Sequence, residues 1–306
     1  MRGAPAWLRH VLVLPVVCLA LGFLLRLALI WAVPTNYSFD AYQRWAGREH
    51  LLIQDWLPAT QSLLVLNEGL GGGLWSARAL LALVASVGMA MAAVVARRLG
   101  GVTAGWCFVP LSLFGPALCW TVVPYQEGTY LALWMSGLAL ALASRDDASR
   151  KGVRLAADLC IGATALCRTE GWPLVALYVL WWRDRESLRA LWGVGFWLAW
   201  KWGVGLEPLR PSPVSYADWE GLGARFELGA YGNSLAKHGG HWIRTGGWAL
   251  WLGGSAGAFL LLRKNDSSSD PVRRWGASLL AWVLCAQLAP TLAWLAGLET
   301  ATVRMT

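Results

Sequence analysis

Three short stretches of this chain hold charged residues whose types and positions could do chemistry. Asp40 lies within the run Asn36–Trp45, and a carboxylate in an outward-facing cleft can act as a general base if it reaches an acceptor hydroxyl. Glu127 lies in a second stretch, and Arg168 and Glu170 form a third. Charged residues placed inside a membrane mark a functional site more often than a structural contact. These stretches are therefore the first candidates for a site.

Each candidate also has a structural interpretation that the sequence leaves open. Asp40 could cap a helix, or pair with Arg44 four residues later on the same helix face. Glu127, Arg168 and Glu170 could form salt bridges that only hold helices together. The functional and structural interpretations differ in whether these charges contact a substrate.

Further charged residues point toward the same outer side of a membrane. Arg26 lies in the outer half of the first apolar segment and Lys201 near the outer end of the seventh. Either side chain could instead extend its charge to lipid headgroups. Asp55 is a second acid in the loop of Asp40, and the alternative is a solvated loop charge. One pair of carboxylates is weak evidence for a metal ion.

Other polar residues receive structural interpretations. Asp158 follows Arg154 by four positions, which is a pairing distance on one helix face. His238 and His241 lack a nearby Cys or third ligand, so we predict no metal site there. The 6 Cys all fall within apolar segments without metal-site spacing, and we interpret them as small core residues without disulfides.

The composition predicts which elements must hold the charged residues. The chain has 306 residues, of which 57% are hydrophobic and only 14% charged, and it contains 22 Trp. Soluble chains are about a quarter charged, and a soluble fold of this length could not cover so much apolar surface. We therefore predict an all-α fold, a polytopic membrane bundle in a single domain over residues 1–306, with membrane lipids as partners.

Apolar runs predict about nine membrane-spanning segments, several of them shorter than the roughly 20 residues that cross a bilayer. They are Val11–Val33, Trp75–Ala96, Val102–Val122, Tyr125–Ser144, Leu155–Cys167, Pro173–Trp182, Leu188–Val204, Trp248–Leu262 and Ala277–Leu298.

Charge asymmetry predicts the orientation of these segments. With a cytoplasmic N-terminus, the inner loops hold a clear excess of Lys and Arg, whereas the outer loops hold slightly more acids than bases when Arg78 is counted with them. This is the positive-inside pattern of a multi-pass membrane protein. The net charge of +8 is thus a topology signal, and we expect no nucleic acid as partner.

Two consecutive short segments predict a cleft. Leu155–Cys167 covers only about 20 Å of helix, Pro173–Trp182 is shorter still, and the hydrocarbon core is about 30 Å thick. The break at Arg168–Pro173 should therefore lie below the outer surface. Charges and irregular backbone at that depth are tolerated only where protein or water surrounds them, so we expect a cleft open to the outside.

The motifs, in this order between apolar segments, resemble those of GT-C glycosyltransferases. Phe39–Ala46 followed by Trp56–Pro58 resembles the first outer loop of that group. Val123–Leu131 resembles its acidic motif, and Ala165–Trp172 its Arg-x-Glu-Gly break. The group includes polyprenyl-phosphate-sugar-dependent mannosyltransferases, protein O-mannosyltransferases, aminoarabinose transferases and GPI-anchor mannosyltransferases. The resemblance covers Leu8 to Trp182.

The resemblance implies a GT-C-like bundle and an inverting transfer of a sugar to a hydroxyl acceptor at the outer membrane face. The donor would be a lipid-linked sugar, carried on polyprenyl phosphate. Asp40 matches the catalytic acid, which acts as general base. Arg168, joined by Lys201 or Arg304, would hold the carrier phosphate. Further residues expected to bind substrate are Glu127, Glu170, Tyr42 and Asp55.

Two departures from the group leave alternatives open. Many members carry an acidic pair in the first loop, whereas Ala41 follows Asp40 here, so the need for a divalent cation stays open. Many members also continue with an outer soluble domain, whereas this chain stops at Thr306. A compact enzyme and an enzyme completed by a partner chain both fit. The rival functions are a secondary transporter or lipid flippase, and a non-catalytic subunit of a membrane glycosyltransferase complex.

Overall fold

The computed structural model shows a chain built from helices. It describes residues 6–33, 39–52, 57–112, 121–146, 151–168, 171–182 and 184–203. Every regular element in these ranges is a helix, as the composition predicts. The predicted spans Trp248–Leu262 and Ala277–Leu298 lie outside the described residues, so they stay predictions.

The chain divides into two compact units. The first comprises Met1–Gly171 and Asp184–Val194, and the second comprises Trp172–Arg183 and Gly195–Thr306. All three motif stretches belong to the first unit, except for Trp172 at the end of the third.

Two helices of the first unit are long and apolar enough to cross a membrane. The first is Val13–Ala32 within α1 (Ala6–Ala32), and the second is Leu74–Arg98 within α4 (Leu74–Ser112). Many of the described side chains of α1 are exposed, among them apolar ones such as Trp31 (77%) and Leu24 (61%). An apolar surface of this kind suits contact with lipid rather than water.

Helix α4 contains two of the predicted spans. It breaks at Gly101, whose φ of +83° lies in the left-handed region that favours glycine, close to the predicted boundary between the spans. The second predicted span was expected to continue to Val122. Instead, the described part of the helix ends at Ser112, and residues 121–126 form turns and bends. Pro124 lies in this irregular stretch, and it has no N–H for a helical bond.

The remaining helices differ from the predicted spans by a few residues at their ends. Helix α6 is Glu127–Asp146, α7 is Lys151–Thr164 and α8 is Gly171–Trp182. The expected span Leu188–Val204 begins as a 3-10 helix, η1 (Ser187–Leu191), which continues into α9 (Trp192–Gly203). Helix α7 ends at Thr164 and α8 begins at Gly171, so residues 171–173, which were predicted to lie in the break, are helical.

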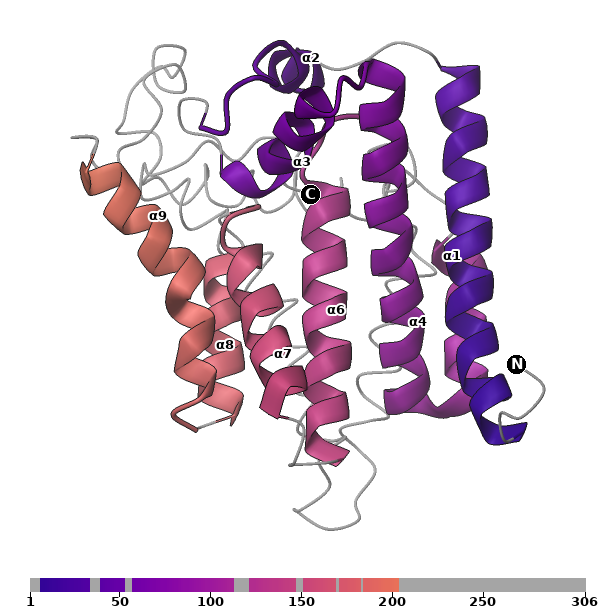
Figure 1. Ribbon diagram of the computed structural model, residues 1–306. Helices are drawn as coiled ribbons and strands as arrows, with labels where there is room; N and C mark the ends of the chain where they lie inside the picture. Colours follow the sequence, from indigo (N-terminus) through magenta and orange to yellow (C-terminus); the bar gives the residue numbers. More distant parts are fainter. Residues whose placement is uncertain are drawn as a thin grey trace, which may run out of the picture. The chain divides into compact units, whose positions relative to one another are not determined.

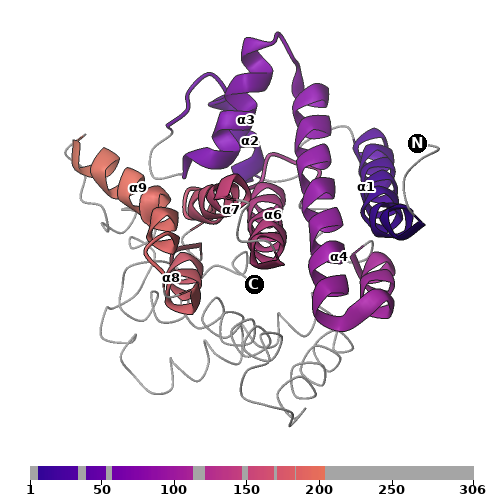
Figure 2. The same ribbon diagram turned by 60° about the horizontal axis from the view of Figure 1, so that its bottom comes forward.

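Four helices of the first unit form a row in the order α1, α4, α6 and α7, each packed on the next (Figure 1; Figure 2). The α4–α6 contact is close because Gly88 lacks a side chain. A Cβ atom at Gly88 would lie 2.7 Å from the backbone nitrogen of Ala132. Small residues at such contacts let two helix backbones approach, as is common in membrane bundles.

Two short helices, α2 (Phe39–Ala46) and α3 (Pro58–Gly69), lie by the ends of these long helices rather than beside them. They occupy the upper end in Figure 1, where α1 ends and where α4 and α6 begin. All three motif stretches thus reach the same end of the first unit.

The second unit shows aromatic pairs within its helices. The rings of Tyr178 and Trp182 in α8 are tilted, with centroids 6.0 Å apart. Trp197 and Trp200 in α9 stack with centroids 5.4 Å apart. These pairs contribute part of the side-chain packing of the second unit.

Candidate functional site

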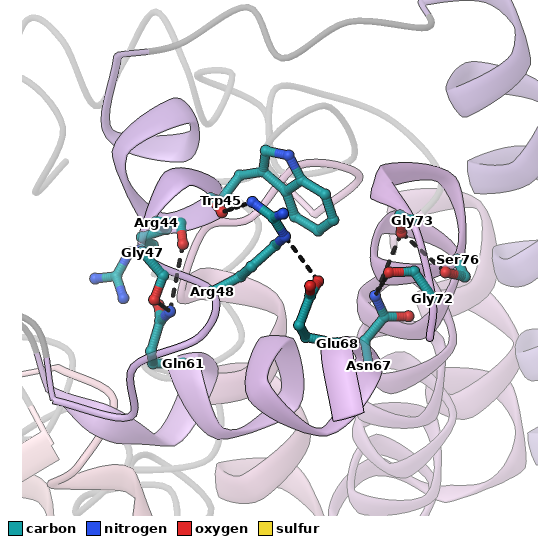
Figure 3. Close-up of polar contacts among 10 residues, drawn as sticks. All are labelled: Arg44, Trp45, Gly47, Arg48, Gln61, Asn67, Glu68, Gly72, Gly73 and Ser76. Atoms are coloured by element: carbon teal, nitrogen blue, oxygen red, sulfur yellow. Dashed lines mark hydrogen bonds and ion pairs between the residues drawn. The ribbon is translucent and has the colours of Figure 1, made fainter. Parts of the chain in front are cut away.

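Helix α2 is fastened to α3 by side chains that reach across the loop between them (Figure 3). The amide nitrogen of Gln61 donates to the carbonyls of Gly47 at 2.8 Å and Arg44 at 3.3 Å. Arg48 donates to Glu68 at 2.7 Å, and its guanidinium lies over the Trp45 ring, 4.6 Å from the centroid. These bonds orient α2, which at 8 residues is too short to be held by a long apolar face.

The end of α3 is in turn fastened to the start of α4. Asn67 donates from Nδ2 to the carbonyls of Gly72 at 3.0 Å and Gly73 at 3.3 Å. Ser76 donates to the same Gly73 carbonyl at 2.8 Å, as Figure 3 shows. The end of α3 is therefore hydrogen-bonded to the turn that leads into α4, which is a candidate membrane helix.

The inner face of α2 rests on residues 121–126, which we call the connecting segment. Ala41, fully buried, packs in one cluster with Val123 and Tyr125. Arg44, one turn later on the same face, is 4% exposed and donates to the side-chain oxygen of Gln126. The first outer loop and the acidic motif, about 80 residues apart in the chain, are thus in contact.

Glu127 joins the acidic motif to the Arg-x-Glu-Gly motif. Its Oε1 accepts a hydrogen bond from Nη1 of Arg168 at 2.6 Å, with side-chain exposures of 33% for Glu127 and 11% for Arg168. Glu127 is the first residue of α6, where the helix dipole favours a negative charge. The charges that the sequence singled out in two separate motifs form an ion pair.

The backbone around Arg168 follows from the end of α7. The Arg168 amide donates to the Thr164 carbonyl at 3.3 Å, and the Arg168 carbonyl accepts from Gly171 at 3.0 Å. The start of α3 contacts the same turn, since the Ala59 amide donates to the Leu166 carbonyl at 2.9 Å. Four elements of the first unit thus meet at this turn: α2, α3, α6 and α7.

Cys167 lies at the centre of these charges. Its thiol is fully buried and interacts electrostatically with Arg44, Arg168 and Glu127. The two arginines and the glutamate therefore share one neighbourhood, which we call the charged cluster (Arg44, Gln126, Glu127, Cys167 and Arg168).

In the described part of the chain, the second oxygen of Glu127, Oε2, is buried and has no hydrogen-bond donor. A carboxylate pairs best with arginine through both oxygens, and an unsatisfied buried acceptor costs about 1–3 kcal/mol. The Glu127–Arg168 pair is therefore incompletely satisfied, which is a feature of sites that bind a further group.

The other predicted site residues are placed only in part. Asp40 is the second residue of α2, one turn before Arg44, and its side chain lies outside the described residues. Tyr42 is 61% exposed, on a different face of α2 from Ala41 and Arg44. Lys201 lies in α9, and its side chain is likewise not described. Asp55, Glu170 and Arg304 lie outside the described residues.

The structure also decides two structural alternatives. Arg26 is 2% exposed and donates to Thr121 Oγ1 at 2.8 Å, so its charge does not extend to lipid headgroups. The predicted Arg154–Asp158 pair is confirmed, with Nε and Oδ1 3.0 Å apart. Arg154 also reaches Asp184 at 3.3 Å, near the start of α7 and away from the charged cluster.

Sequence reasoning missed the contributions of Arg44, Gln126 and Arg78 to this end of the molecule. Arg78 is fully buried in α4, although its position near a span end suggested an outer-loop charge. It is the single charged residue between Trp75 and Ala96, and a lone arginine in an apolar span was the signal that could have found it.

Within the residues that the structure describes, no group of three or more His, Cys, Asp or Glu side chains is placed to hold a metal ion. Ala41 occupies the position after Asp40 and is buried in the cluster with Val123 and Tyr125. A second carboxylate at that position would therefore face apolar side chains.

Comparison with known proteins adds no assignment: no family model, curated protein sequence or solved structure matches this chain significantly.

Proposed function

We propose that this protein is a multi-pass membrane glycosyltransferase of the GT-C type. It transfers a sugar from a polyprenyl-phosphate carrier to a hydroxyl acceptor at the outer membrane face, with Asp40 as general base. The observation that carries the proposal is the meeting of the three motifs: Arg44 bonded to Gln126, and Glu127 paired with Arg168.

The membrane setting is supported by the two long apolar helices within α1 and α4. Along the helix axes, the charged cluster lies near the level at which α1 ends and α4 begins. If these helices cross a bilayer, that level corresponds to one membrane surface. The positive-inside pattern assigns that surface to the outside. A lipid carrier would then present its headgroup at the depth of the charged cluster.

The reaction requires one proton acceptor and one group that stabilises the leaving phosphate. The acceptor oxygen forms a bond to the anomeric carbon and passes its proton to Asp40. The bond between that carbon and the phosphate oxygen breaks, and the carrier phosphate leaves with the electron pair. Attack from the face opposite the phosphate inverts the anomeric configuration.

Arg168 suits the role of phosphate ligand. Its guanidinium is mostly buried, at 11% exposure, and a guanidinium donates several hydrogen bonds in a plane that matches phosphate oxygens. Glu127 holds Arg168 in place through one oxygen, and no described residue donates a hydrogen bond to its second oxygen. That oxygen would accept from a hydroxyl of the substrate.

Transfer assays with purified protein test this proposal. Wild type, Asp40→Asn and Glu49→Gln would be incubated with radiolabelled mannosyl phosphopolyprenol and a panel of hydroxyl acceptors. Glu49 is an exposed acid just after α2, so its substitution is the matched control. We expect transfer by wild type and the control and a loss of about 100-fold or more in Asp40→Asn, as general bases contribute 10²–10⁴-fold.

Equal turnover by Asp40→Asn and wild type would refute the role of Asp40. Uptake of solute into proteoliposomes without any sugar transfer would instead favour a transporter. Transfer only in the presence of a co-purifying chain would favour a subunit of a larger enzyme.

A further inference from the structure

Two buried arginines from two different helices hold the connecting segment. Arg26 of α1 donates from Nε to Thr121 Oγ1 at 2.8 Å and from Nη1 to the Gly22 carbonyl at 3.0 Å. Arg78 of α4 donates from Nε to the Val122 carbonyl at 2.7 Å. Arg26 thus bonds the first residue of the segment, and Arg78 bonds the second.

Arg78 makes a second bond that joins a third element. Its Nη1 donates to the Val33 carbonyl at 2.6 Å, just after the last residue of α1. A guanidinium has five donors in a rigid planar fork, so it can bond two carbonyls that belong to different segments. Arg78 is fully buried and thus links α4, the end of α1 and the connecting segment.

The connecting segment needs such donors because it is buried and irregular. Thr121, Val122 and Val123 are each at most 4% exposed, and the stretch lacks the backbone bonds of a helix. A buried, irregular backbone is stable only where its polar groups find partners in the protein. Burying two arginines is costly because each charge leaves water, and the hydrogen bonds to this segment offset part of that cost.

We propose that Arg26 and Arg78 are positioning residues for the site: by holding the connecting segment, they fix the position at which α6 begins. The inference rests on the proposed function for its catalytic meaning. The segment ends in Gln126 and Glu127, which contact Arg44 and Arg168. If the bonds of Arg26 or Arg78 are lost, the start of the segment moves, and the contacts of Gln126 and Glu127 move with it.

The substitution Arg78→Lys separates the effect of the planar donor geometry of Arg78 from the effect of its charge. The lysine keeps the positive charge, but its ammonium is a compact point charge on a flexible stem and lacks the planar fork. The Val33 and Val122 carbonyls would then not be held at fixed positions relative to each other. Arg48→Lys is the matched control, since the contacts of Arg48 in the described part of the chain are with Glu68 and Trp45 of the α2–α3 layer.

A double-mutant cycle of Arg78→Lys with Glu127→Gln tests the inference. Transfer from mannosyl phosphopolyprenol should fall about tenfold or more in Arg78→Lys, because misplacement of a site by about 1 Å can cost 100-fold. In the Glu127→Gln background, the same change should cost less than about twofold. Interacting sites are non-additive in this way, whereas independent sites are additive.

Thermal unfolding of the same variants in detergent gives a readout that needs no activity. The Tm shifts of Arg78→Lys and Glu127→Gln should sum to more than the shift of the double variant, while Arg48→Lys and Glu127→Gln should add. Additive behaviour of Arg78→Lys in both measurements would overturn the inference and leave the glycosyltransferase proposal intact.

The two proposals fail separately. Absence of transfer by wild type with every acceptor would overturn the proposed function, and the unfolding cycle would still decide whether Arg78 positions Glu127. If Arg78→Lys does not fold, Arg26→Lys enters the same cycle with the same expected coupling, and additivity there would overturn the inference.

Discussion

Glu127 Oε1 lies 2.6 Å from Nη1 of Arg168, which joins the first residue of α6 to the turn after α7. The two residues are 41 positions apart in the chain, and each belongs to a different motif. Their pairing gives the charged cluster a fixed anion and a fixed cation.

The Glu127–Arg168 pair should couple energetically. Glu127→Gln and Arg168→Gln should each lower Tm, because each leaves the other partner in a mostly buried place without its counter-ion. The double variant should lose less than the sum of the two, with a coupling on the order of 1 kcal/mol. Unfolding followed by Trp fluorescence measures it.

The Arg48–Glu68 pair is the control for this cycle, with a similar separation of 2.7 Å and exposures of 28% and 33%. Its variants should reduce sugar transfer less than those of Glu127 and Arg168, because α2 keeps its bonds to Gln61 when the Arg48–Glu68 pair is lost. Equal loss of transfer in both pairs would contradict the special role of the Glu127–Arg168 pair.

Ala41→Asp should destabilise the protein rather than create a metal site. The methyl group of Ala41 is fully buried against Val123 and Tyr125, and a carboxylate there would lose its water against apolar side chains and disturb the Arg44–Gln126 contact beside it. Ala46→Asp, at an exposed position of the same helix, should change Tm little. Added Mg²⁺ or Mn²⁺ that rescued Ala41→Asp would argue against this prediction.

Gly88→Ala should disrupt the α4–α6 contact. Its new Cβ would lie 2.7 Å from the Ala132 amide nitrogen, so the helices must separate, and overpacking of this kind costs about 1–3 kcal/mol. Gly152→Ala in α7 meets no atom within 4 Å and should be neutral or stabilising, since alanine favours helix. A Tm for Gly88→Ala that equals wild type would show that the contact is looser than described.

Asp158→Asn should lower stability without affecting transfer. Asp158 is fully buried and pairs with Arg154 at 3.0 Å, and loss of one partner of a buried pair costs about 3–5 kcal/mol. Glu186→Gln breaks a pair of 3.9 Å whose side chains are 47% exposed, so its Tm should stay near wild type. Loss of specific activity in folded Asp158→Asn would place this pair in the site after all.

The helical class and several local features could be predicted from the sequence. Apolar runs locate α6, α7, the end of α1 and the start of α4 to within a few residues, because burial in lipid or in a helical core depends on composition and length. The Arg154–Asp158 pair could be predicted for the same reason, since a helix brings residues four positions apart onto one face.

The partners of Arg44, Arg78, Glu127 and Arg168 depend on contacts between segments far apart in the chain. Helical periodicity carries no information on which distant carbonyl a buried guanidinium meets. Residues 121–126 are mostly apolar but irregular, with Pro124 among them, so hydropathy extended one predicted span to Val122 and began the next at Tyr125. Sequence alone determined which residues are charged and which segments are apolar. Only the packing of α1, α2, α4 and α6 decided which charges lie together, because the free energy of a buried ion depends on the partners that the fold supplies.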